Sequence, residues 1–166
     1  MKNKFLNIIL AAAVFFVMAL NANALIRSDA DIYASINRLN SLVVYDFNSL
    51  FNKSEIIGYR LDSFNYSTLQ YKNAARNVYE YFNSVIGQIN TINNSTEISN
   101  TDKQLQISNL YQNAEAALYD LNSKSVNYLI SLRGVMPTIT YQKYVKSFVK
   151  YYNSLQLTDA PISFGK

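Results

Sequence analysis

The chain lacks three residue types that carry much of protein chemistry: its 166 residues include no cysteine, no histidine and no tryptophan. Without cysteine, disulfide scaffolds, thiol nucleophiles and lipid attachment to a cysteine are excluded. Without histidine as well, the usual zinc ligand sets and imidazole acid–base catalysis are excluded. The function classes that remain need neither a thiol nor an imidazole.

Glycine and proline are also scarce, with four and two residues, and no glycine belongs to a phosphate-binding loop or a nucleophile-elbow motif. Carboxylates that could serve catalysis stand singly in the sequence, at Glu55, Glu80, Glu97 and Glu115. General acid–base catalysis and di-metal centres both need such groups in sets. We therefore expect no catalytic residues, no metal and no cofactor, and a protein that is not an enzyme.

One long apolar run is present, at the N-terminus. It spans residues 5–20, follows two lysines and precedes the small-x-small triplet 22–24. This three-part pattern is typical of a cleavable export signal. A permanent anchor is the alternative, but residues 5–20 as a helix would span only about 24 Å of a hydrocarbon core about 30 Å thick. The pattern predicts a signal peptide cleaved after Ala24, a single mature domain over residues 25–166, and a periplasmic or secreted protein.

Charge is small in total and uneven along the chain. The formal net charge is +4, and the lysines of the export signal contribute two of these charges. Residues 25–123 carry ten acidic and seven basic side chains, whereas residues 124–166 carry six basic and one acidic. The small total argues against nucleic acid as a partner. The basic end indicates either an ordinary solvated helix face or a surface that attracts an acidic partner or an anionic membrane.

Apolar residues recur at alternating steps of three and four through most of the mature chain. The longest of these stripes runs over residues 57–92 and the next over residues 107–132, with shorter ones over residues 32–50 and 141–155. Such steps place side chains on one face of an α-helix. The sequence therefore predicts four helices and an all-α fold.

Capping residues set the expected helix boundaries. Three pairs fit a capping box, in which a side-chain oxygen accepts from a free N–H at a helix start: Ser28 with Asp31, Asn52 with Glu55, and Thr101 with Gln104. Gly134 and Pro137 should end the third helix. Thr138 or Thr140 should open the fourth helix, which we expect to end before residues 159–161.

The expected helices differ in length, at about 35, 60, 50 and 30 Å in chain order. Short loops make neighbouring helices antiparallel, so the outer two can cover only part of the inner two. We expect an antiparallel four-helix bundle with an elongated central helical hairpin, residues 75–113, whose tip lies near residues 93–100. A break at Gly87 or at residues 65–68 would instead give a compact five-helix bundle, the alternative fold.

Three groups of residues are candidates for partner binding because each should leave an apolar or basic side chain on the surface. They are the hairpin-stripe residues Val78, Phe82, Val85 and Ile89, the outward-facing Tyr59 and Tyr66, and the basic-face residues Lys143, Lys146 and Lys150. We expect the hairpin stripe to be covered on one side only, which would leave apolar area for a partner or a second copy. Tyr45 and Ile130 are also expected to be exposed.

These features predict an exported helical-bundle protein that acts by protein–protein interaction and not by catalysis. It could serve as a periplasmic adaptor, a chaperone-like factor or a secreted factor directed at a host or competitor cell. Its partner would be another protein or a second copy of the chain. The alternative is a membrane-surface-active helical protein that uses the basic amphipathic fourth helix on an anionic bilayer.

Overall fold

The computed structural model describes residues 26–56, 58 and 60–164. These residues form helices and connecting segments, with no strand among them. In chain order the elements are α2 (Asp29–Val44), the 3-10 turns η1 (Phe47–Leu50) and η2 (Lys53–Glu55), α3 (Leu61–Asn94), α4 (Asn100–Ser131) and α5 (Thr138–Ser154). The predicted export signal, its cleavage after Ala24, and Tyr59 lie outside the described residues.

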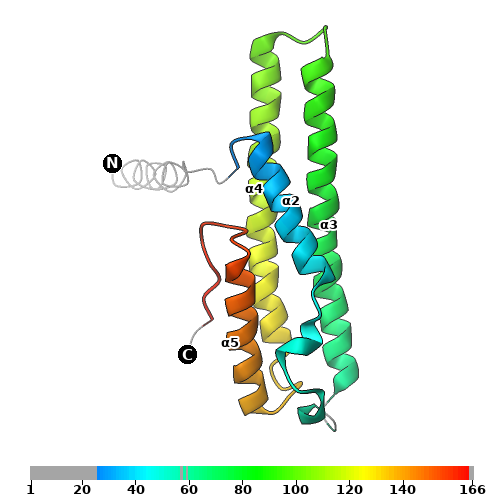
Figure 1. Cartoon of the computed structure of the whole chain (residues 1–166), viewed down its shortest axis with the longest axis vertical. Helices are drawn as coiled ribbons and strands as arrows, with labels where there is room; N and C mark the ends of the chain where they lie inside the picture. Colours follow the sequence, from blue (N-terminus) through cyan, green and yellow to red (C-terminus); the bar gives the residue numbers. More distant parts are fainter. Residues whose placement is uncertain (1–25, 57, 59, 165–166) are drawn as a thin grey trace, which may run out of the picture.

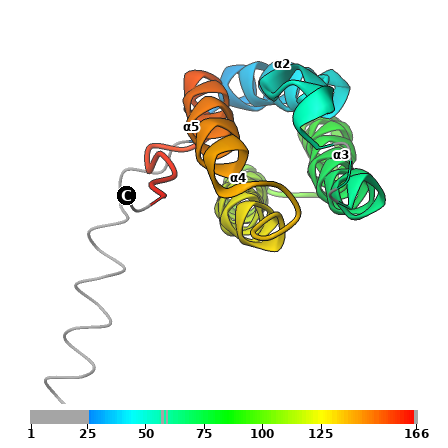
Figure 2. The ribbon, with the colours of Figure 1, turned by 90° about the horizontal axis from the view of Figure 1, so that it is seen from below.

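The four helices surround one core, as the end-on view shows (Figure 2). Helix α3 runs antiparallel to α2 and α4 and packs closely on both (Figure 1). The α3–α4 hairpin extends beyond α2 and α5 at one end of the molecule, where residues 95–99 make its turn. The predicted antiparallel four-helix bundle with an elongated central hairpin is confirmed.

Serine side chains cap the starts of α2 and α4. Ser28 caps α2 as predicted: its hydroxyl accepts from the Asp31 N–H at 3.3 Å and donates to the Asp31 carboxylate at 2.8 Å. Helix α4 is capped by Ser99, whose hydroxyl makes the same pair of bonds with Asp102, at 3.2 and 2.7 Å. The predicted cap at Thr101 is wrong by two residues, because Asp102 at the box position also places a carboxylate at the positive end of the helix.

The segment between α2 and α3 is the largest departure from expectation. The first helix ends at Val44 instead of near residue 50, and the second begins at Leu61 instead of after Asn52. Asp46 and Asn52 each accept an N–H from the residue two positions on, at 3.0 and 3.2 Å. Such short side-chain bonds compete with helical ones. The irregular link also contains Gly58, whose backbone has φ +99°. Residues other than glycine rarely adopt this angle.

Helix α3 continues without interruption through residues 65–68 and through Gly87. The compact five-helix alternative is therefore wrong. A Cβ added at Gly87 would meet no atom within 4 Å, so this glycine lies on an open face of the helix. One exposed glycine lowers helix stability by about 1 kcal/mol relative to alanine. The packing of α3 along its length is sufficient to keep the helix continuous in spite of this loss.

The ends of α4 and α5 follow the predicted signals. Gly134 adopts φ +82° just after α4, and Pro137 precedes the first turn of α5. Helix α5 opens at Thr138, one of the two predicted positions, and ends at Ser154, ahead of residues 159–161.

The core contains the predicted faces of α3 and α4, and a face of α5 that is rotated from the predicted one. The stripe over residues 141–155 predicts Tyr141, Val145, Phe148 and Tyr152 in the core. Phe148 and Tyr152 are buried, together with Thr140 and Tyr144, whereas Tyr141 and Val145 are only half-buried. Tyr144 takes the central place because its ring packs at 5.7 Å from that of Phe64 and buries more surface than a valine. This rotation of α5 turns Tyr141 and Val145 toward the outside of the bundle.

Candidate partner-binding surface

The predicted hairpin stripe is part of the core. Val78, Phe82, Val85 and Ile89 are all at most 7% exposed. The expectation that this stripe leaves apolar area uncovered is wrong, because the start of α2 also lies against the hairpin (Figure 1). Tyr111 of α4 donates to the Asp29 carboxylate at 2.7 Å, and Ile26 is fully buried. Partner contact at these four side chains would require the hairpin to open.

The predicted exposed apolar residues divide into two groups. Tyr66 and Ile130 are 66% and 52% exposed, as the helical phase indicates. Tyr45 was expected to be exposed and is half-buried, since its ring stacks on that of Tyr151 at 3.7 Å. It follows the end of α2 and so does not obey the helical phase of that helix.

The three predicted lysines lie on one helix and are all exposed. Lys143, Lys146 and Lys150 project from α5, which contains no acidic residue. Arg133, also exposed, adds a fourth cation just ahead of α5. An ion pair forms on the neighbouring helix, between Lys124 and Asp120 of α4 at 2.6 Å.

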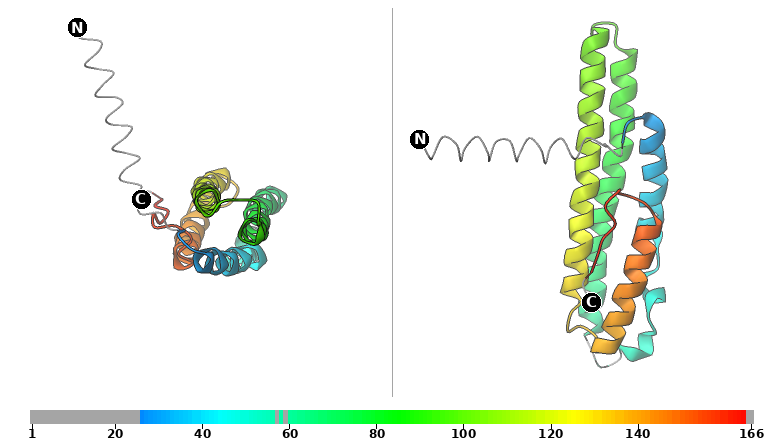
Figure 3. Two further views of the ribbon diagram at one scale, coloured as in Figure 1. Left: turned by 90° about the horizontal axis from the view of Figure 1, so that it is seen from above. Right: turned by 90° about the vertical axis from the view of Figure 1, so that its left-hand side faces the viewer.

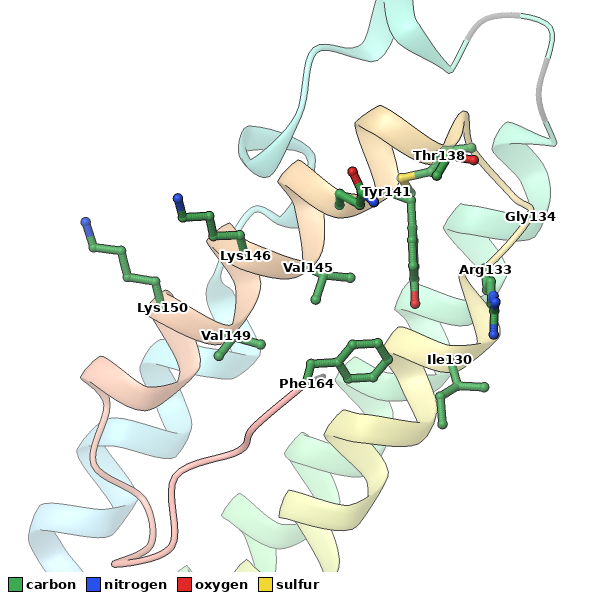
Figure 4. A pocket seen from close by; sticks show the side chains of 12 residues that line it. Ile130, Arg133, Gly134, Thr138, Tyr141, Val145, Lys146, Val149, Lys150 and Phe164 are labelled. Carbon is green, nitrogen blue, oxygen red and sulfur yellow. The ribbon is translucent and has the colours of Figure 1, made fainter. Parts of the chain in front are cut away.

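Two of these lysines border a groove of about 940 Å3 between α4, α5 and the C-terminal segment. We call it the α4–α5 groove. Apolar and aromatic side chains supply much of its lining, namely Ile130, Met136, Tyr141, Val145, Val149 and Phe164. Its basic residues are Arg133, Lys146 and Lys150, and among the residues that the structure describes no carboxylate side chain belongs to its lining. Figure 4 shows the valines facing the groove and the two lysines extending outward from α5.

Tyr141 ties the two walls of the groove together. Its hydroxyl donates to the Leu129 carbonyl of α4 at 3.0 Å. A tyrosine hydroxyl is protonated at neutral pH, and burial raises the pKa of Tyr141 further above its usual value, so the hydroxyl remains a donor into alkaline conditions. The groove therefore has a wall of defined position at its α5 end.

The C-terminal segment turns after α5 and returns alongside it (Figure 3). Gln156, at φ +51°, begins the reversal, and Leu157 and Ile162 anchor the segment in the core. Asn153 holds Ile162 by both backbone groups: it accepts the Ile162 N–H at 3.0 Å and donates to the Ile162 carbonyl at 3.1 Å. Two residues later, the Phe164 ring lies in the groove (Figure 4).

The sequence identified the lysines of this surface but missed its apolar part. Tyr141 and Val145 were assigned to the core, while Arg133, Val149 and Phe164 were not singled out. One signal was present: beside the line of Tyr144, Phe148 and Tyr152, α5 carries a second apolar line at Tyr141, Val145 and Val149. The two lines together make a wide apolar face, whose edge can line a groove on the surface.

The groove can supply apolar contact, hydrogen-bond donors and positive charge. No group of three potential metal-ligating side chains occurs among the residues the structure describes. None of the described helices combines the length and apolar character needed to cross a bilayer. The arrangement suits the binding of an anionic molecule that also carries apolar groups.

Comparison with known proteins gives no family for the chain, since no family model, curated protein or solved structure matches it significantly.

Proposed function

We propose that the chain is an exported helical-bundle protein that acts by binding an acidic protein partner, without catalysis, on the α4–α5 groove and the lysine face of α5. One observation carries the proposal: apolar and basic side chains lie next to each other there, and none of the described lining residues carries a carboxylate. Apolar side chains at the centre of an interface supply binding energy. Cations at its edge attract and orient a partner of opposite charge.

The position of α5 supports this role because bonds to three other elements hold the helix in place. Thr140 donates to Glu55 of η2 at 2.7 Å, and Tyr151 donates to the Ser41 carbonyl of α2 at 3.1 Å. The Tyr144 and Tyr128 hydroxyls are 2.7 Å apart and join α5 to α4. A surface that is rigid before binding loses less conformational entropy on association. The lysine face of α5 is therefore ready for a partner without rearrangement of the bundle.

The test compares two variants of residues 25–166 with equal changes of charge. Lys146→Glu with Lys150→Glu reverses two charges at the groove. Arg60→Glu with Arg76→Glu reverses two exposed charges on the α3 side. Each protein is used to capture partners from the envelope fraction of the producing cell at low and high salt. The proposal expects an acidic protein that is retained by the control variant, lost with the lysine variant and weakened by salt. Equal capture by both variants would contradict it.

A second candidate function is binding to an anionic membrane surface. Ile139 is 69% exposed at the start of α5 and lies on the same helical face as the three lysines, at steps of four, three and four. An apolar residue beside lysines favours contact with a bilayer surface. Flotation with anionic vesicles distinguishes the two functions: binding that high salt abolishes supports the membrane candidate, and absence of binding supports the protein partner.

A further inference from the structure

Hydrogen bonds outside the α4–α5 groove fix the C-terminal segment so that Phe164 enters the groove. Asn122 of α4 donates to the Ala160 carbonyl at 3.0 Å, and Asn153 of α5 pairs with both backbone groups of Ile162. Ile162 is buried, Ser163 is exposed and Phe164 is half-buried in the groove. An aromatic side chain of an extended segment therefore fits this groove, and side chains seated in pockets give specificity in peptide recognition.

The C-terminal segment makes apolar contact with the groove but brings no charged side chain from residues 160–164 to its basic residues. Residues 160–164 carry no charged side chain. Arg133, Lys146 and Lys150 line the groove, and none of the other described lining residues carries a carboxylate. Phe164 thus contributes apolar contact, while residues 160–164 provide no side chain of opposite charge to these cations.

We propose that the α4–α5 groove is a peptide-binding site for an acidic segment of the partner, and that this segment replaces Phe164. Its anchor is one aromatic side chain in the place of the Phe164 ring. Carboxylates on either side of that anchor meet Arg133, Lys146 and Lys150. The inference rests on the proposed function and specifies how the partner engages the surface.

The anchored part of the segment limits what must move. Ile162 belongs to the core and is held by two hydrogen bonds with Asn153, so exchange requires only the Phe164 side chain to leave the groove. Phe164 competes at high effective concentration because it is tethered to the site. A free peptide without charge would have no advantage over it. An acidic peptide gains the contacts with the three cations, and this difference selects acidic partners.

The test uses a defined probe, a fluorescein-labelled peptide with one phenylalanine between two pairs of aspartates. Its binding to residues 25–166 is measured by fluorescence anisotropy, for the unchanged chain and for Phe164→Ala. The variant should bind about tenfold more tightly, because removal of one half-buried phenyl competitor changes the free energy by roughly one factor of ten in affinity. Ser163→Ala, at the exposed neighbouring position, is the matched control and should leave the affinity unchanged.

Two further measurements establish the nature of the contacts. Lys146→Glu with Lys150→Glu should abolish binding, and a probe with alanine in place of its phenylalanine should bind at least tenfold more weakly. Circular dichroism verifies that each variant keeps its helices. Equal or weaker binding of the probe by Phe164→Ala would overturn the proposal.

Other occupants would be recognised by different results. Dimers of the unchanged chain that disappear with Phe164→Ala would identify the C-terminal segment of a second copy as the occupant. Binding of oleate but not of the peptide would identify an anionic lipid. Either result overturns the peptide proposal. If the lysine variant loses its protein partner but Phe164→Ala has no effect on the probe, the proposed function stands and this inference fails.

Discussion

The rings of Tyr71 on α3 and Tyr128 on α4 stack at 4.7 Å with 9° between their planes. Each hydroxyl reaches the polar residue that interrupts the apolar stripe of the opposite helix: Tyr71 and Ser125 are 2.6 Å apart, and Tyr128 and Thr68 are 2.8 Å apart. Ser125 donates to the Leu121 carbonyl, so the Tyr71 hydroxyl is the donor to Ser125. Thr68 and Ser125, the polar residues of the two apolar stripes, thus provide hydrogen-bond partners for the buried hydroxyls of Tyr128 and Tyr71.

The first prediction concerns this pair. Ser125→Ala leaves the Tyr71 hydroxyl without an acceptor and should lower the free energy of unfolding by about 1–3 kcal/mol. Adding Tyr71→Phe should recover much of that loss, because the unpaired donor is then gone. Urea denaturation measures both effects. Ser123→Ala, exposed on the same helix, is the control, and an equal effect of the two alanine substitutions would contradict the pairing.

The second prediction is a loss of stability in alkali. Burial raises the pKa of Tyr128 and of Tyr152 to about 12 and holds those of Tyr71 and Tyr144 well above their usual value. In the unfolded chain each hydroxyl titrates near pH 10. Between these values the folded chain binds more protons, so the free energy of unfolding must fall as pH rises.

The raised pKa values of these tyrosines contribute to the free energy of unfolding fully below pH 10, and this contribution is lost as the pH approaches 12. For a group that titrates two pH units higher when folded, the loss is about 2.7 kcal/mol. Urea denaturation across this pH range measures it. Tyr66→Phe, at an exposed position, should leave the pH dependence unchanged, whereas Tyr128→Phe should reduce it. A free energy of unfolding that stays constant up to pH 12 would show that these hydroxyls are not buried.

A third prediction tests the continuity of α3. Gly87→Ala should stabilise the protein by about 0.5–1 kcal/mol, because the site is helical and the new Cβ meets no atom within 4 Å. Gly134→Ala should instead destabilise it, since Gly134 adopts φ +82°, where alanine is strained. Thermal unfolding of the two variants gives the signs. Destabilisation by Gly87→Ala would show that α3 is broken there.

The fourth prediction concerns local opening of the hairpin. Amides of residues 78–89 should exchange with solvent as slowly as those of residues 32–42, because both segments are helical and line the core. Amides at the hairpin tip, residues 93–103, should exchange faster, since most side chains there are exposed. Hydrogen exchange with mass spectrometry resolves these segments. Faster exchange over 78–89 than over 32–42 would restore the hairpin stripe as an accessible surface.

The parts of the fold that could be predicted from sequence are those that depend on interactions between residues close together in the chain. The long stripes of α3 and α4, the Ser28 cap and the Gly134 stop each depend on spacing along one helix. The break after Val44 could not be predicted because Asn52, the predicted cap of the second helix, caps a short 3-10 turn equally well, as Asp46 also does.

The candidate surface could be predicted only in part, for a different physical reason. The exposure of Lys143, Lys146 and Lys150 follows from helical phase. The face of α5 that enters the core depends on contacts with residues far away in sequence, such as that of Tyr144 with Phe64. The position of Phe164 in the groove likewise depends on the two hydrogen bonds between the Asn153 side chain and the Ile162 backbone. Residue spacing along the sequence does not predict these bonds.

The central claim is that the α4–α5 groove binds an acidic protein partner. Photocrosslinking in the producing cell tests it most directly, with a crosslinking amino acid in place of Gln142, an exposed residue of the groove, or of Asn77, an exposed residue of α3. The account predicts an adduct with an acidic protein from position 142 that disappears when Lys146→Glu and Lys150→Glu are added, and no such adduct from position 77. An adduct from position 77 alone, or one from 142 that survives the lysine changes, would contradict it.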